Sequence, residues 1–127
     1  TGKIIGCAIE VHKALGPGLL ESIYERCLMQ ELKLNGFNFK SQQVIPVDYK
    51  GINLDCELRY DLLVEDIMIV ELKAVNEIHP IYDAQILTYM KLLKKPKGLL
   101  INFNSTNIFH KGQKTYVNEY FRLLPEK

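Results

Sequence analysis

The sequence contains little cysteine: Cys7, Cys27 and Cys56 are scattered through 127 residues, with no CxxC pair and no histidine at a ligand spacing. This pattern argues against a structural zinc site and a disulfide framework, and it fits a reducing compartment, so we expect a cytoplasmic protein. Long apolar runs are also missing, which argues against a transmembrane helix and a membrane partner. No secretory leader is recognisable, and the chain begins at Thr1, which fits a processed or trimmed start.

Other familiar catalytic devices are absent as well. There is no phosphate-cradling GxGxxG or GxxxxGK[ST] motif, and His12, His79 and His110 have no evident nucleophile as a partner. No internal repeat or low-complexity linker divides the chain, which is long enough for one compact domain and too short for two. We therefore expect residues 1–127 to form a single domain.

The charge is nearly balanced, at +1, but the basic residues gather late in the chain. Between positions 91 and 122 the only acid is Glu119, against seven basic residues: Lys91, Lys94, Lys95, Lys97, Lys111, Lys114 and Arg122. A local basic surface attracts phosphate backbones. The alternative is a solvated lysine face that keeps the protein soluble, and charge alone favours this alternative.

Apolar periodicity and turn residues predict the elements. We expect helices over 3–15, 19–36 and 80–95, and strands over 37–51, 54–64, 67–75 and 98–104. A turn is expected at Lys50-Gly51, and the segment 114–124 is favoured as a strand over a helix. This order predicts an α/β (α+β) fold, in which a three-stranded antiparallel meander and a helical crossover build a mixed sheet flanked by helices.

The stretch "IVELKA", residues 69–74, places two charges in a strand that otherwise looks buried. Glu71 and Lys73 are two residues apart and so share one face of the strand. If a three-residue loop (65–67) joins this strand to the preceding one, Asp61 falls opposite Glu71 on the same face. A two-residue loop would separate the two carboxylates unless a bulge restored the alignment.

Such a group has a chemical use. Asp61 and Glu71 offer hard oxygen ligands for Mg²⁺, and the backbone carbonyl of Leu72 offers another. Lys73 could orient a water or stabilise charge on a phosphoryl oxygen. The alternative is a salt bridge on a half-exposed strand, because the ExK pattern is common by chance. These residues by themselves leave both interpretations open.

Two helical features add to the pattern. Glu21 flanks the apolar stripe of its helix, which fits a third carboxylate at the site, although a glutamate in a first helical turn also suits the helix dipole. Gln85 and Tyr89 are spaced i,i+4 and share a helix face, which also fits ordinary amphipathic packing.

Together these residues resemble a known family. Asp61 followed by Glu71-x-Lys73 resembles the PD-(D/E)XK nuclease superfamily, and Gln85-x-x-x-Tyr89 resembles the QxxxY motif of its RecB-like branch. The stretch "LGPGLLESIYE" is similar to the motif that names the GxxExxY protein family, through Gly18, Glu21 and Tyr24. The resemblance covers nearly the whole chain, and it departs from the superfamily pattern at Tyr60, where the nominal Pro-Asp pair has proline.

The resemblance implies a restriction-endonuclease-like fold and a nuclease that cleaves phosphodiester bonds, with DNA as the favoured substrate. It implies that Asp61, Glu71 and Glu21 serve an Mg²⁺ or Mn²⁺ ion and that Lys73 is catalytic. Three further residues would be accessory or would contact nucleic acid: Gln85, Tyr89 and Tyr24. The alternative is a catalytically silent nucleic-acid-binding or accessory subunit. Because the chain is small and weakly charged, we also expect a homodimer or a partner protein.

Overall fold

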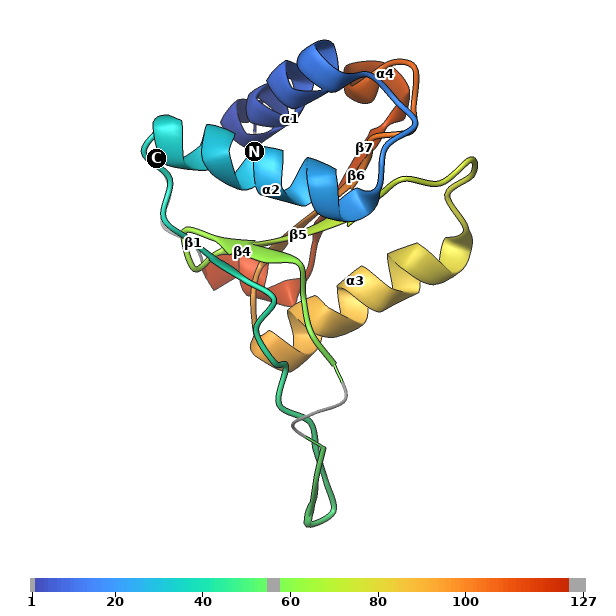
Figure 1. Cartoon of the computed structure of the whole chain (residues 1–127). Coiled ribbons are helices and arrows are strands. Elements are labelled where there is room, and N and C mark those ends of the chain that lie inside the picture. Colours follow the sequence, from blue (N-terminus) through green and yellow to red (C-terminus); the bar gives the residue numbers. More distant parts are fainter. Residues whose placement is uncertain (1, 55–57, 124–127) are drawn as a thin grey trace.

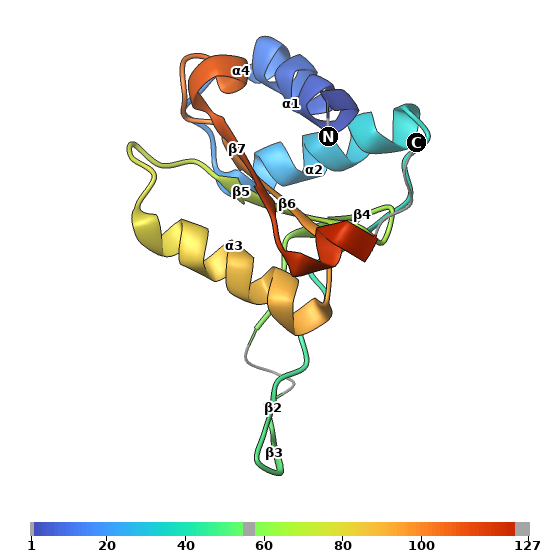
Figure 2. The ribbon, with the colours of Figure 1, turned by 180° about the vertical axis from the view of Figure 1, so that it is seen from behind.

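A five-stranded mixed sheet forms the centre of the fold, in the spatial order β1-β4-β5-β6-β7. The computed structural model describes residues 2–54 and 58–123. The strands of the sheet are β1 (Phe39–Ser41), β4 (Leu62–Val64), β5 (Met68–Lys73), β6 (Lys97–Asn102) and β7 (Gln113–Val117). Helices α1 (Gly2–Leu15) and α2 (Glu21–Leu34) cover one face, and α3 (Pro80–Leu93) covers the other (Figures 1 and 2).

The strand directions confirm the predicted mixed sheet. β1, β4 and β5 are antiparallel to one another in turn, and β5 and β6 are parallel. The parallel pair is joined by α3, because two parallel strands need a long crossover connection. β7 then pairs antiparallel with β6 and closes the sheet on that side.

A separate hairpin interrupts the predicted meander. β2 (Asp48–Tyr49) and β3 (Ile52–Asn53) pair only with each other and project from the body of the protein (Figures 1 and 2). The expected turn at Lys50-Gly51 is confirmed, with φ values of 46° and 91° that suit a tight hairpin. Of the predicted strand 54–64, residues 55–57 lie outside the described part, and β4 begins only at Leu62.

Alternation along the strands produces two apolar clusters, one on each face of the sheet. On the α1–α2 face, the fully buried side chains include Leu62, Val70, Leu99, Ile101, Leu28 and Leu32. On the α3 face, the buried cluster includes Leu63, Ile69, Leu100, Ile86 and Met90. Odd-numbered residues of β4 and β5 therefore face α3, and this parity decides where the charged residues of β5 lie.

The C-terminal segment is only partly strand. The predicted strand is present as β7, but a 3₁₀ helix, η1 (Glu119–Leu123), follows it. Asn118 lies between β7 and η1. Its side chain accepts a hydrogen bond from the Tyr120 N–H at 3.1 Å, at the start of η1, and donates one to the Lys95 carbonyl at 3.0 Å. A short helix that was not expected, α4 (Ile108–Lys111), is capped by Asn107. No helix in the described part of the chain is long and apolar enough to cross a membrane.

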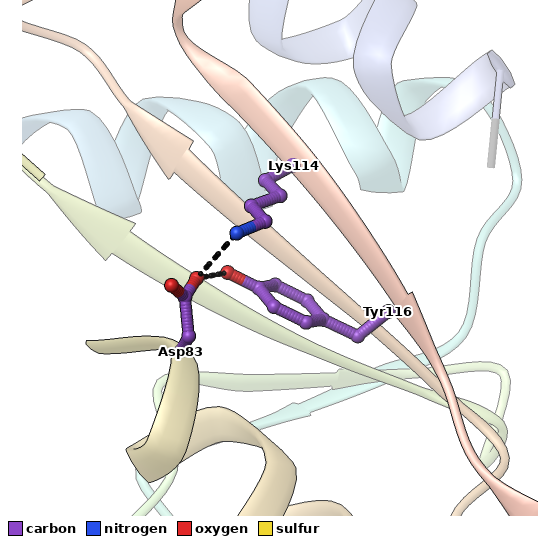
Figure 3. A network of polar contacts seen from close by, with 3 residues as sticks. All are labelled: Asp83, Lys114 and Tyr116. Carbon is purple, nitrogen blue, oxygen red and sulfur yellow. Dashed lines mark hydrogen bonds and ion pairs between the residues drawn. The ribbon is translucent and has the colours of Figure 1, made fainter. Parts of the chain in front are cut away.

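A polar contact holds the first turn of α3 against the edge strand β7. Asp83 Oδ1 accepts hydrogen bonds from Lys114 Nζ, at 3.0 Å, and from the Tyr116 hydroxyl (Figure 3). These two hydrogen bonds lower the pKa of Asp83 below its ordinary value. The contact fixes the N-terminal end of α3, which also carries residues near the charged end of β5.

Asp83→Asn should lower the melting temperature by a few degrees at pH 7, because it removes the charge while keeping the shape of the side chain. The lowered pKa of Asp83 means that its stabilisation is present above the ordinary value of 3.8 and is lost as pH falls through the folded-state value. The two melting curves should therefore converge in strong acid. Glu10→Gln, on the exposed side of α1, is the control, and an equal difference at both pH values would contradict this role.

Candidate active site

The pairing of β4 with β5 brings two acidic residues together. The loop between the strands, 65–67, has the three residues that the expected alignment requires, and Leu62 lies opposite Val70. Extending this register by one position places Asp61 opposite Glu71. Asp61 lies where the alternation of faces breaks, because Tyr60 packs in the cluster on the α3 face and Leu62 in the cluster on the α1–α2 face.

Two backbone amides fasten these carboxylates to each other's strand. Glu71 Oε2 accepts a hydrogen bond from the Asp61 N–H at 2.7 Å, and Asp61 Oδ2 accepts one from the Leu72 N–H at 2.8 Å. Both hydrogen bonds lie just beyond the last paired residues of β4 and β5, Leu62 and Val70. The C=O of a strand residue points to the same side as its N–H, so the Leu72 carbonyl also faces this edge. Each carboxylate keeps one oxygen outside the two contacts.

Glu71 is buried, with 6% of its surface exposed. Burial, followed by the negative charge of Asp61, raises the pKa of Glu71 to about 8. The Asp61 N–H and the charge of Lys73 act in the opposite direction but do not outweigh burial. A buried carboxylate with a raised pKa beside a second carboxylate is typical of a functional site, because a structural position would favour a neutral residue.

Lys73 does not form the salt bridge that was the alternative interpretation of "IVELKA". Among the described residues it makes no ion pair with a carboxylate. Its Nζ instead lies 4.5 Å from the centre of the Tyr82 ring, in the first turn of α3. The aromatic face attracts the ammonium group without neutralising it. The Lys73 ammonium group thus meets an aromatic ring in place of a described carboxylate.

Two further carboxylates approach from α2. Glu21 is exposed and forms no side-chain hydrogen bond with the described residues, but the charges of Lys73 and Asp61 both act on its pKa, which partial burial raises. Glu25 lies one turn later on α2, and its side chain is held by a hydrogen bond: Glu25 Oε1 accepts from Gln42 Nε2 at 2.9 Å. The same Nε2 donates to Asp61 Oδ1 at 3.1 Å.

The electrostatic neighbours of Glu71 also differ from the expected set. The charge of Glu25 contributes to raising the pKa of Glu71, whereas Glu21 is not among its contributors. Burial, Asp61 and Glu21 raise the pKa of Glu25 itself. Sequence reasoning named Glu21 and missed Glu25, although the i,i+4 spacing of the two residues on α2 was an available signal. Gln42 and Tyr82 had no comparable signal.

The residues of the GxxExxY pattern have distinct places. Gly18 has a φ of 101°, a conformation that favours glycine, in the turn that leads into α2. Tyr24 is fully buried, stacks on Phe103 at 4.6 Å, donates its hydroxyl to the Gly16 carbonyl and accepts a hydrogen bond from the Leu19 N–H. Tyr24 is thus a core residue that fastens the turn, and it lies out of reach of a nucleic acid.

Gln85 and Tyr89 lie on α3 and contact each other. Gln85 Nε2 donates to the Tyr89 hydroxyl at 2.9 Å. Burial raises the pKa of Tyr89, and the charges of Glu71 and Asp61 raise it further. The hydroxyl therefore stays protonated and lies within the electrostatic range of the two carboxylates.

The donor set suits a divalent cation of the magnesium type. Among the described residues, no three His, Cys, Asp or Glu side chains converge closely enough to enclose an ion. Mg²⁺ does not require such a cage, since it keeps several waters and uses one or two carboxylates. Asp61, Glu71 and the Leu72 carbonyl provide hard oxygen atoms at one edge, and the mutual repulsion of the carboxylates would be relieved by a cation.

A comparison with protein families places the chain in a known superfamily. The family model described as the PD-(D/E)XK nuclease superfamily matches residues 1–115. The matched range contains α1 to α4, the first four strands of the sheet and most of β7. Neither the curated proteins nor the solved structures contain a match.

Glu71→Gln should stabilise the metal-free protein at high pH. The pKa of Glu71 is raised from 4.5 to about 8, so its contribution to stability is fully present below pH 4.5 and is lost as pH rises through 8. Glutamine still accepts the Asp61 N–H but carries no charge. In EDTA, the variant should melt several degrees above the wild type above pH 8, and the gain should vanish near pH 4.5. Glu10→Gln is the control, and a gain independent of pH would refute the assignment.

Proposed function

The chain belongs to the PD-(D/E)XK nuclease superfamily, and we propose that it is a metal-dependent nuclease that hydrolyses phosphodiester bonds of DNA. The observation that carries this proposal is the reciprocal fastening of Asp61 and Glu71 by backbone amides, beside a Lys73 that forms no ion pair with any described carboxylate. A purely structural cluster would pair the lysine with a carboxylate. Here backbone amides hold the two acids in place, and neither acid is neutralised by an ion pair with Lys73.

Each residue has a role in this proposal. Asp61, Glu71 and the Leu72 carbonyl would hold Mg²⁺ or Mn²⁺, and Glu21 and Glu25 would support that charge from α2. A bound divalent ion lowers the pKa of a water and polarises the phosphorus centre. Lys73 would orient the attacking water or stabilise charge on a phosphoryl oxygen. Gln85 and Tyr89 would donate hydrogen bonds along the path of the phosphate.

A surface cavity includes the aromatic ring that Lys73 contacts. The segment after β5 and the first turn of α3 line this cavity, formed by Val75, Asn76, Glu77, His79 and Tyr82. Tyr82, which lines this cavity, also contacts the Lys73 ammonium group. We propose that the scissile phosphate approaches from this side.

Electrostatics favour an enzyme over a silent binding subunit. The charge of Asp61 raises the pKa of three carboxylates, Glu21, Glu25 and Glu71, and the charge of Lys73 lowers the pKa of Glu21 and Glu71. Without a cation, such a site would repel phosphate, so it makes a poor binding surface. With a divalent ion, the same charges become a means of positioning that ion.

The basic residues do not concentrate on the site. Lys97 begins β6 opposite Met68, at the far end of β5 from Glu71. Lys95 and Lys114 are taken up in ion pairs with Asp66 and Asp83, at 2.9 and 3.0 Å. Because few basic side chains are available to bind phosphates near the site, we propose that a second copy or a partner protein contributes to holding the substrate.

The free thiols of Cys7 and Cys27 support a proposed cytoplasmic location.

The direct test incubates the purified protein with labelled single- and double-stranded DNA and RNA, each with Mg²⁺, Mn²⁺ or EDTA. Cleavage with either metal and none in EDTA is the expected result, with DNA cut in preference to RNA. Binding of nucleic acid without cleavage under every condition would instead support a silent subunit and overturn the nuclease proposal.

Lys73→Ala should reduce cleavage by about 10²-fold or more, the range for loss of a group that acts on the reacting atoms, while Mn²⁺ affinity survives. Asp61→Asn should lose both cleavage and Mn²⁺ binding, because it removes a ligand charge. Lys3→Ala, an exposed lysine on α1, is the control for lysine loss. Cleavage rates and calorimetric Mn²⁺ titrations check both variants, and an active Lys73→Ala would exclude Lys73 from the mechanism.

A further inference from the structure

Gln42 joins the two sides of the candidate site. Its Nε2 donates to Glu25 Oε1 on α2 at 2.9 Å and to Asp61 Oδ1, just before β4, at 3.1 Å. An amide nitrogen carries two N–H bonds, so a single group can serve both carboxylates. The reverse orientation of the amide would place its oxygen against two acceptors. The surroundings therefore determine both the position and the orientation of this side chain.

The backbone of Gln42 is held in an unusual conformation. Its φ is 51°, in the left-handed region that residues other than glycine adopt only at a cost. The Gln42 N–H donates to the Asp61 carbonyl at 2.9 Å, and Arg59 Nη1 donates to the Gln42 carbonyl at 3.0 Å. Contacts on both sides of the peptide thus maintain the conformation that directs the side chain toward Glu25 and Asp61.

We propose that Gln42 is a positioning residue of this site: it holds Asp61 and Glu25 at a fixed separation without cancelling their charge. The inference rests on the proposed nuclease function. A lysine or arginine in this place would also bridge the two acids, but it would neutralise them and compete with a divalent cation. A glutamine amide donates the same hydrogen bonds and leaves both negative charges available.

The geometry of Asp61 explains why the bridge matters. Asp61 Oδ2 is fixed by the Leu72 N–H, and Asp61 Oδ1 is fixed by Gln42. Without Gln42 the carboxylate keeps one of its two anchors, and Glu25 loses its link to the site. Partners that orient a metal ligand from behind commonly change metal affinity or activity by 10- to 100-fold.

The test compares Gln42→Asn with Gln43→Asn. Asparagine tolerates the left-handed backbone and keeps the amide, but its side chain is one methylene shorter and cannot reach both carboxylates. Gln43 is the matched control, because its side chain is exposed and, within residues 2–54 and 58–123, donates only to the Ser41 carbonyl. Melting temperature, Mn²⁺ affinity by calorimetry, and cleavage rate as a function of Mn²⁺ concentration are measured for both variants and the wild type.

Gln42→Asn should melt close to the wild type, bind Mn²⁺ about 10-fold more weakly and need a correspondingly higher Mn²⁺ concentration for half-maximal cleavage. Gln43→Asn should match the wild type in all three measurements. Wild-type Mn²⁺ affinity in Gln42→Asn would overturn the positioning role and leave the nuclease proposal standing, since the wild type would still cleave. A wild type that neither binds Mn²⁺ nor cleaves would refute the proposed function, and this inference with it.

Discussion

The register between β4 and β5 is the constraint on which the rest of the site depends. The loop that sets it, 65–67, has positive φ at Glu65 and Asp66, of 55° and 58°. Both residues are tied down by their side chains, Asp66 to Lys95 at 2.9 Å and Glu65 to the Asn38 N–H at 3.2 Å. A slip of one residue would turn Asp61 to the opposite face of the sheet, since the side-chain period of a strand is two. Loop geometry far from the chemistry thus decides whether two carboxylates meet.

Burying Glu71 beside a second carboxylate destabilises the metal-free fold, and apolar packing elsewhere on β5 offsets this cost. Burying Glu71 next to Asp61 disfavours its charged form. The other face of the same strand packs Val70 and Leu72 against α1 and α2 with almost no exposure. β5 therefore has one face that is apolar, and a second face on which Ile69 packs in the core beneath α3 while Glu71 and Lys73 carry charge.

Much of this arrangement was predictable from local patterns. Alternation in "IVELKA" predicted the faces of β5, and the loop length that aligns Asp61 with Glu71 is the one found. The parts that escaped prediction depend on contacts between distant segments. Gln42 meets Glu25 across 17 residues of sequence, and Lys73 rests on Tyr82 instead of a carboxylate. Neither contact follows from periodicity, because each depends on how α2 and α3 dock on the sheet. The buried place of Tyr24 likewise depends on its packing against Phe103.

The spacing of these contacts along the chain has a consequence for folding. Asp61 and Glu71 are ten residues apart and meet in one hairpin, an element that forms in about 1–10 μs in small systems. The link from Gln42 to Glu25 and Asp61 closes loops of 17 and 19 residues and requires α2 to be docked. Longer closures cost more entropy and come later. A nascent chain should therefore gather its two central acids early, and it gains the bridge that steadies them only once α2 has docked on the sheet, so the proposed activity depends on that docking.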